Sequence, residues 1–477
     1  MLSIFFDFFG ELRKKEVFYV NWKGHIFIED HLNGEGDVDL FVPLIDKAKF
    51  EKVASKIGFV NVRSYQADHD FIEHYYAYDE REQKFAHLHV YFKIVTGESF
   101  SKNYVLPIDN YLKLNIEDRS GLPTMNGSAR RTIFLVRHFL KIGTLYGALQ
   151  YYREREKYYL EWESFDKSSE CKEVREIGIT SSDLKRMEKI FIAGGVMKNF
   201  LCAKKLKCML RTYQRRDFFK YHCYLFFNLF VRIFNRLIIK RKKVFHDGLA
   251  VAICGLDGTG KSSLVESITS HYSNHFSVKN LHLGRPAATK ISLFLKPLLI
   301  LRSQFKILNG VNSSQFQSQI SENNISILYA LRSVVLAYDR MVASKKVQKF
   351  RNKGYLVVCD RYPGLNEGKM DSPRIVMDNT KGPLYQYLYK VEQKFYRSIK
   401  PVDILFNLQA PLEVAIERND MRDKLGKEST EELRERFSIN SGVSFLSDKT
   451  IDIDATKSIK NVFATVARDI WLIGLRK

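Results

Sequence analysis

The stretch Ala250-Val-Ala-Ile-Cys-Gly-Leu-Asp-Gly-Thr-Gly-Lys-Ser-Ser263 decides the fold of the second half of the chain. Its first five residues are apolar and predict a strand, and the next eight fit G-x-x-x-x-G-K-[ST] at every fixed position. Glycines let backbone N–H groups turn toward phosphate oxygens, and a helix opening at the lysine adds its dipole. We therefore expect an ATP phosphate site made of Gly255, Asp257, Gly258, Thr259, Gly260, Lys261, Ser262 and Ser263.

Two side chains in this stretch have expected roles of their own. The Lys261 ammonium would neutralise the β- and γ-phosphates of ATP. The Ser262 hydroxyl would ligate Mg²⁺. The sequence therefore predicts both ATP and Mg²⁺ as ligands.

Apolar runs of strand length recur after this loop and are separated by helical stretches. Such runs are typical of a parallel sheet covered by helices on both faces. We expect residues 248–477 to form a doubly wound α/β domain with strands at Leu249–Cys254, Val278–Leu283, Tyr355–Cys359, Asp403–Leu408 and Thr450–Ile453.

Charged residues follow two of these strands. Asp360 ends a strand expected beside the phosphate loop, where its carboxylate would hold the water shell of a metal, and Arg361 would reach a phosphate of an acceptor. Arg418 and Arg422 are one helical turn apart, so both would point the same way. The alternative is that these two arginines have no role in the site and belong to an exposed charged helix over 417–436.

Asp257 in the loop, Asp360-Arg361-Tyr362 and the arginine-bearing segment 417–424 occur in an order and spacing that resemble the thymidylate kinase family. The resemblance covers residues 248–477. It implies a phosphotransferase in which Arg418 and Arg422 sit on a lid over the transferred phosphoryl group, and Asp257 faces the acceptor sugar or the metal.

The resemblance leaves the acceptor open. No thymine pocket can be traced, and the stretch 286–324 is longer than a minimal member of that family needs. The acceptor is expected to be a nucleoside monophosphate such as dTMP, or a related small phosphate acceptor. Weaker candidates for acceptor recognition are Arg285, the segment Asp371–Arg374, and the helix Ser333–Ala343 with Tyr338, Asp339 and Arg340.

A second pair of carboxylates lies in residues 1–125, which are expected to form an α+β domain. Asp37 and Asp39 follow Gly24-His25 and are two residues apart, so a strand would place both on one face. Paired carboxylates on one face suit Mg²⁺ chelation. The pattern resembles the minimal nucleotidyltransferase fold, fused ahead of thymidylate kinase-like domains in bacterial proteins. Two positions depart from it: His25 replaces a Gly or Ser, and His87 stands where a third carboxylate is expected, so that His87 or His89 would be the substitute ligand.

Residues 126–247 are expected to form a helical extension and a basic linker. Between Lys204 and Lys243 there are thirteen Lys or Arg residues against one acid, Asp217. Such a segment is a solvated linker, a membrane-surface helix or a nucleic-acid contact. Aromatic residues interleaved with the cations fit either of the last two.

The whole chain of 477 residues, with a formal net charge of +22, is long enough for two or three domains. The six cysteines form no CxxC pair, and the N-terminus lacks the features of a secretory signal, so we expect a cytoplasmic protein without a transmembrane span. The leading expectation is an ATP-dependent phosphotransferase. The alternatives are a nucleotide-binding switch docked on a membrane or nucleic acid, and a bifunctional kinase and nucleotidyltransferase.

Overall fold

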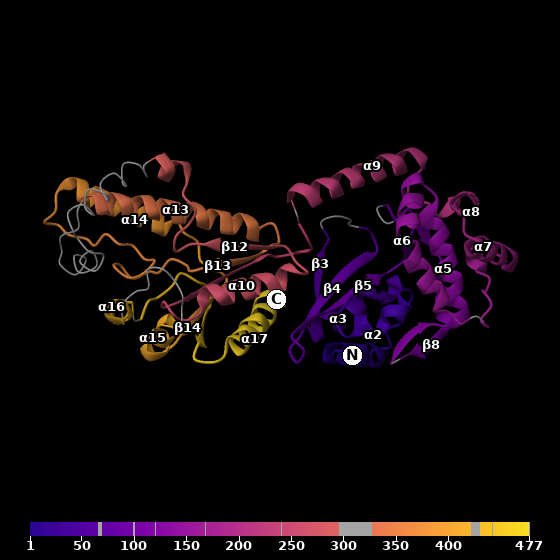
Figure 1. The fold of residues 1–477 in the computed structure, drawn as a ribbon, viewed down its shortest axis with the longest axis horizontal. Helices are drawn as coiled ribbons and strands as arrows, with labels where there is room; N and C mark the ends of the chain where they lie inside the picture. Colours follow the sequence, from indigo (N-terminus) through magenta and orange to yellow (C-terminus); the bar gives the residue numbers. More distant parts are fainter. Residues whose placement is uncertain are drawn as a thin grey trace. The chain divides into compact units, whose positions relative to one another are not determined.

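The chain forms two compact units in a computed structural model, Met1–Lys243 and Val244–Leu475. Each unit is described by itself (Figure 1). The structure describes residues 1–64, 69–98, 101–119, 121–166, 168–239, 241–294, 327–420, 430–440 and 442–476. In these ranges no helix combines the length and apolar character needed to cross a membrane.

The second unit is built on a parallel sheet with strands at the predicted places. Its strand order is β12-β13-β11-β14-β15, and every neighbouring pair is parallel. The α/β class predicted for this half is therefore confirmed. The strands are β11 (Leu249–Gly255), β12 (Val278–His282), β13 (Leu356–Asp360), β14 (Ile404–Gln409) and β15 (Thr450–Asp454), and the short β10 (Val244–Phe245) precedes them.

Helices cover both faces of this sheet (Figure 1). α13 (Ile327–Arg351) and α14 (Pro383–Arg397) lie on one face, and α10 (Lys261–Ser273) and α17 (Ile459–Asp469) lie on the other. The shorter α15 (Leu412–Asp420) and α16 (Thr430–Ile439) follow β14. Because β11 lies between β13 and β14, the chain after β11 leaves the sheet where the strand order reverses, the usual place of a ligand crevice in such sheets.

The first unit contains a mixed sheet with the order β3-β4-β5-β2-β1-β9-β8. β2 and β5 are parallel, whereas β4 and β5 form a long antiparallel pair. The elements are α1 (Ser3–Lys14), β1 (Val20–Asn21), α2 (Ile28–Leu32), β2 (Val38–Phe41), α3 (Lys47–Ile57), β3 (Val60–Arg63), β4 (Ile72–Asp79), β5 (Lys84–Tyr91), β6 (Ile94–Thr96), β7 (Tyr104–Leu106), α4 (Asp109–Leu114), β8 (Ile116–Arg119) and β9 (Leu122–Met125).

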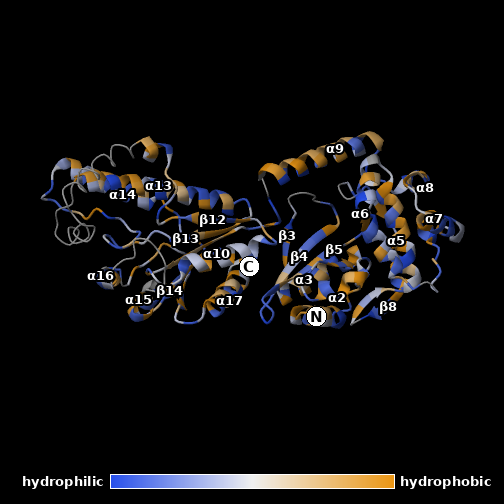
Figure 2. Cartoon of the chain, viewed as in Figure 1, coloured by the Kyte–Doolittle hydropathy of each residue, from blue (hydrophilic) through white to orange (hydrophobic). Residues whose placement is uncertain are grey.

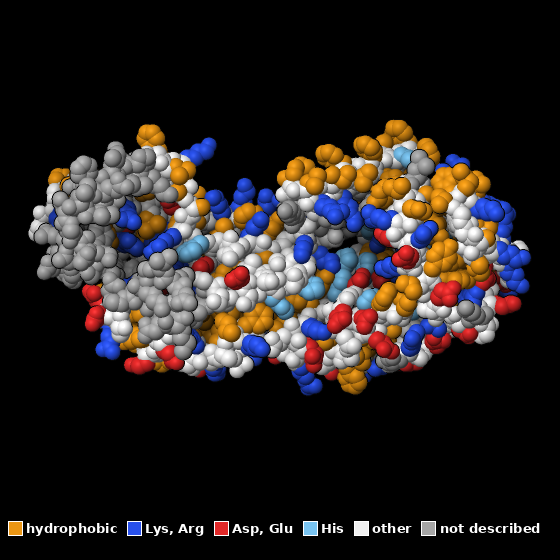
Figure 3. All heavy atoms as spheres, viewed as in Figure 1, with side chains coloured by type: hydrophobic (Ala, Val, Ile, Leu, Met, Phe, Trp, Pro, Cys, Tyr) orange, Lys and Arg blue, Asp and Glu red, His pale blue; other side chains and the backbone are white. Residues whose placement is uncertain are grey.

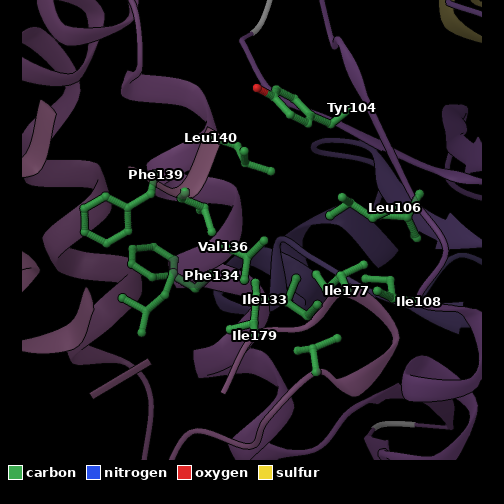
Figure 4. Packing of buried hydrophobic residues seen from close by; sticks show 14 of the residues in the cluster. Tyr104, Leu106, Ile108, Ile133, Phe134, Val136, Phe139, Leu140, Ile177 and Ile179 are labelled. Atoms are coloured by element: carbon green, nitrogen blue, oxygen red, sulfur yellow. The ribbon is translucent and has the colours of Figure 1, made fainter. Parts of the chain in front are cut away.

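A group of helices follows and shares a core with the sheet. It comprises α5 (Gly127–Ile142), α6 (Leu145–Glu163), α7 (Ser181–Ala193) and α8 (Val196–Met209), and α9 (Phe218–Phe234) follows them along the chain. Figure 4 shows α5 contributing Ile133, Phe134 and Val136 to a core that also contains Leu106 and Ile179. These helices belong to the same compact unit as the strands before them. The predicted domain boundaries at 125 and 247 stay predictions.

Candidate phosphate site and a second carboxylate–histidine site

The loop after β11 is a turn that only glycine fits at three positions. Gly255, Gly258 and Gly260 have φ of 139°, 87° and 85°. A Cβ on Gly255 would lie 2.4 Å from the carbonyl oxygen of Leu408, and one on Gly258 would lie 2.9 Å from that of Ala415. Since these contacts are with backbone atoms, no side chain fits at Gly255 or Gly258, and the glycines let the backbone turn as a phosphate-binding loop requires.

Lys261 begins α10 and folds back over this loop. Its Nζ donates to the carbonyl oxygen of Leu256 at 2.6 Å and lies 3.6 Å from Oδ1 of Asp257. The side chain is buried, and burial lowers the pKa of Lys261 to about 8. An ammonium held this way beside a helix N-terminus is suited to an anionic ligand. Thr259 donates to the same carbonyl, and Ser263 is exposed in the first turn of α10.

Asp360 and Ser262 meet beside Lys261. Parallel pairing places Asp360 opposite Ile253 on β11, and the Ser262 hydroxyl donates to Oδ2 of Asp360 over 3.4 Å. Oδ1 of Asp360 is buried and has no hydrogen-bond partner among the described residues. A hydroxyl and a carboxylate with an unpaired buried oxygen form a donor set that fits Mg²⁺.

Asp257 is held by two arginines from distant parts of the chain. Its Oδ1 accepts from Arg361 at 2.5 Å, and its Oδ2 pairs with Arg436 of α16 at 2.6 Å. Although burial opposes ionisation, the charges of Lys261, Arg361 and Arg436 lower the pKa of Asp257 to about 2. Arg361 itself has φ of 67°, so a left-handed turn after β13 directs its side chain back toward the loop.

A second carboxylate, Asp371, extends this network away from the loop. Its Oδ2 accepts from Arg361 at 3.3 Å, and its Oδ1 pairs with Arg340 at 2.6 Å. Arg340 is fully buried and also donates to the carbonyl oxygens of Leu283 and Gly284. Arg340 therefore has the environment of a structural residue, whereas Arg361 links Asp257 of the loop to Asp371.

The other predicted site residues are dispersed. Arg418 lies on α15 and Arg422 lies outside the described residues, so the predicted pairing of these two arginines stays a prediction. Arg285 is exposed, and Asp339 is buried where it accepts from Ser292. Sequence reasoning did not single out Arg436, because nothing in its local pattern distinguishes it from other arginines of a charged helix.

In the first unit, three potential metal ligands converge. Asp37, Asp39 and His89 each offer one ligand atom, and these atoms lie within 4.8 Å of one another. Nδ1 of His89 is 3.3 Å from Asp37 Oδ2 and 2.9 Å from Asp39 Oδ1. Although burial opposes ionisation, the hydrogen bond from His89 lowers the pKa of Asp37, and Lys23 and His89 together lower that of Asp39.

His89, and not His87, completes this group. Pairing of β2 with β5 sets Asp39 opposite His89. His87 instead stacks on Tyr76 and lies with Nε2 at 3.0 Å from Nδ1 of His74, and burial keeps its pKa well below the usual value. Figure 3 shows histidine side chains gathered beside acidic ones over this unit. His25 is buried, and burial lowers its pKa to about 3.

Lysines surround the carboxylates. Lys23 lies 2.6 Å from Oδ1 of Asp39, and Lys102 donates to the hydroxyl of Tyr91 at 3.2 Å. Burial and, to a smaller extent, the charge of the nearby Lys23 lower the pKa of Lys102 to about 7. Burial likewise lowers the pKa of Lys141 to about 7, with Arg137 and Lys23 adding repulsion. Cations crowded this closely against few carboxylates suit an anionic ligand.

Comparison with known proteins gives distant similarity over about half of the chain. The uncharacterized ATP-binding protein YghR of Escherichia coli (strain K12) is 24% identical over 233 residues, which are 47% of this chain and 88% of that protein. Thymidylate kinase of Blochmanniella pennsylvanica is 26% identical over 48% of this chain and 98% of its own length. Thymidylate kinase of Thermosipho africanus is 24% identical over 45% and 94%. No family model matches. About half of this chain is therefore distantly similar to proteins that are named as ATP-binding or as thymidylate kinases.

Proposed function

We propose that Val244–Leu475 is a P-loop phosphotransferase domain that moves the γ-phosphoryl group of ATP to a nucleoside monophosphate, such as dTMP, or a related small acceptor. The observation that carries the proposal is a loop whose conformation requires glycine, with the Lys261 side chain folded over it and the Ser262–Asp360 pair beside it. The distant similarity to thymidylate kinases points to the same chemistry. We infer that the matching half of the chain is this unit, since it carries the loop.

Each residue has a defined task in this proposal. Lys261 exchanges its hydrogen bond to the Leu256 carbonyl for phosphate oxygens and becomes fully protonated as it does so. Ser262 and Asp360 hold Mg²⁺, which supplies charge neutralisation at the transferred phosphoryl group. Loop N–H groups orient the phosphate chain for in-line attack.

The pair of arginines on Asp257 indicates where the acceptor binds. Arg361 and Arg436 converge on one carboxylate, and their planar donors match phosphate oxygens equally well. A phosphate on the acceptor would draw Arg361 toward itself, and Asp257 would then accept a hydrogen bond from an acceptor hydroxyl. The acceptor therefore carries both a phosphate and a hydroxyl, as a nucleoside monophosphate does.

Acceptor-dependent ADP formation tests this function. Purified full-length protein, supplied with ATP and Mg²⁺, is assayed with nucleoside monophosphates, nucleosides and phosphorylated sugars. We expect at least one phosphorylated acceptor to raise the rate of ADP formation far above the rate with ATP alone. Equal rates with and without every acceptor would contradict the proposal and favour a nucleotide-binding switch.

A second candidate function belongs to the first unit, where His89 joins Asp37 and Asp39. We propose that these three side chains bind a divalent metal and that Lys102 and Lys141 face the phosphates of a nucleotide, as nucleotidyl transfer requires. Two carboxylates and an imidazole are a ligand set for Mg²⁺ or Mn²⁺. Lys23 pairs with the same oxygen of Asp39 and would compete with the metal.

Mn²⁺ binding tests this second site. Removing one ligand charge with Asp39→Asn should weaken Mn²⁺ binding about tenfold or more, measured from the free-ion signal in electron paramagnetic resonance without nucleotide. Glu80→Gln, at an exposed carboxylate of the same unit, is the matched control and should leave binding unchanged. Equal affinities of wild type and Asp39→Asn would rule the site out.

A further inference from the structure

α9 has its apolar face on the outside. Phe219, Cys223, Phe226, Phe230, Phe234 and Leu237 recur at spacings of three and four, so they form one stripe that runs from α9 into the helical turn after it. All six side chains are exposed, with Phe226 76% and Phe230 63% accessible. Figures 2 and 3 show this stripe as a continuous apolar band along the helix. We call these six residues the outer stripe.

Polar contacts fix this orientation. Tyr221, Asn228 and Asn235 recur every seven residues on the opposite side, where Tyr221 and Asn235 are buried. The Tyr221 hydroxyl donates to Glu98 at 2.6 Å, and Asn235 donates to the carbonyl oxygen of Arg241 at 2.8 Å. The bond from Tyr221 to Glu98 attaches this polar side of the helix to its unit, whereas the bond from Asn235 stays within the segment that follows the helix. The phenylalanines of the outer stripe point away from the attached side, the reverse of an ordinary surface helix.

The charges around the outer stripe select its partner. α9 contains no acidic residue. Lys220 is exposed beside the outer stripe, and Arg232 and Arg236 are exposed cations on the polar side of the segment. A second copy of such a helix would bring like charges together. Single-stranded nucleic acid needs cations alongside each stacked base, whereas here the phenylalanines form an unbroken apolar row. Aromatic residues on one face and cations beside it match an anionic lipid surface.

We propose that α9 lies in the headgroup region of an anionic lipid bilayer, with the outer stripe inserted between acyl chains and the long side chains of Lys220, Arg232 and Arg236 reaching the phosphates. This docking is independent of the kinase proposal, because it uses no residue of the phosphate site. It would place the enzyme next to a membrane without a spanning helix.

Vesicle flotation of the full-length protein tests the proposal. We expect wild type to float with phosphatidylcholine vesicles that contain phosphatidylserine, and Phe226→Ser together with Phe230→Ser to lower the partition coefficient about tenfold or more. The matched control replaces Leu149 and Leu160, two exposed leucines of α6, by Ser and should float like wild type. Lys220→Gln with Arg236→Gln should reduce the preference for phosphatidylserine.

Several results would overturn the proposal. Equal flotation of the double Phe variant would mean that net charge alone drives binding. Loss of self-association or of single-stranded RNA binding in that variant, without any vesicle binding by wild type, would assign the stripe to those partners. Should the variant misfold, Phe226→Trp preserves the apolar face: its indole emission should shift to the blue with anionic vesicles, and an unshifted spectrum contradicts insertion.

Discussion

Lys261→Ala is expected to lower acceptor-dependent ADP formation by about 10³-fold, because the transferred phosphoryl group then loses the positive charge of a buried lysine. The loss should appear mainly in kcat, since the backbone N–H groups of the loop still bind the phosphate chain. Steady-state kinetics with ATP and the best acceptor measure both parameters.

The fold should survive this substitution. When Lys261 is removed, the carbonyl of Leu256 still accepts a hydrogen bond from Thr259, and Asp257 retains Arg361 and Arg436 as partners. Lys345→Ala, at an exposed lysine of α13, is the control for loss of a positive charge in the same unit. Activity of Lys261→Ala close to that of wild type, with both variants folded by circular dichroism, would refute the proposed role of the loop.

Local pattern predicted most of the second unit. Runs of apolar residues gave the strands to within two residues. The three central strands β11, β13 and β14 are buried on both faces, so their apolar runs are continuous and their ends are clear. The glycine loop was equally readable, since its backbone needs residues without a Cβ at fixed spacings. Asp360 and Ser262 meet as the strand order implies.

Contacts between distant segments were not predictable in the same way. Arg436 reaches Asp257 only after α16 has folded back over the loop, and no local pattern records that path. In the first unit, the sequence placed Asp37 and Asp39 on one face of a strand and left His87 and His89 as alternative third ligands. Only the register of β2 against β5 decides that His89 meets the carboxylates.

The basic segment shows a third kind of limit. Its cations and phenylalanines were evident in the sequence, but periodicity alone says which residues share a face and not which face is covered. The hydrogen bond from Tyr221 to Glu98 and the burial of Asn235 supply that direction. From the sequence alone, the apolar stripe could equally have been a face buried in the core. The structure shows that the opposite, polar side of the helix is the one attached to the unit.

Arg340→Met is expected to lower the free energy of unfolding of the second unit by about 3–5 kcal/mol, because it removes one partner of a buried ion pair. Asp371 would lose its 2.6 Å contact, and the carbonyls of Leu283 and Gly284 would lose their donor. Hydrogen exchange of peptides from β11 and β13 in rising urea reports this unit apart from the other.

Controls on the same helix separate a structural role from acceptor recognition, the role that the sequence favoured for Arg340. Arg332→Met, at an exposed arginine of α13, should change stability by no more than about 0.5 kcal/mol. Combining Arg340→Met with Asp371→Asn should cost less than the sum of the single changes, since the second change removes the charge that the first leaves unpaired. A stable Arg340→Met variant with a raised KM for the acceptor alone would instead mean that Arg340 reaches the acceptor. That result would also change the interpretation of Arg361. Asp371 would then connect two arginines that both bind the acceptor, whereas in the present proposal it holds only Arg361 in position for the acceptor.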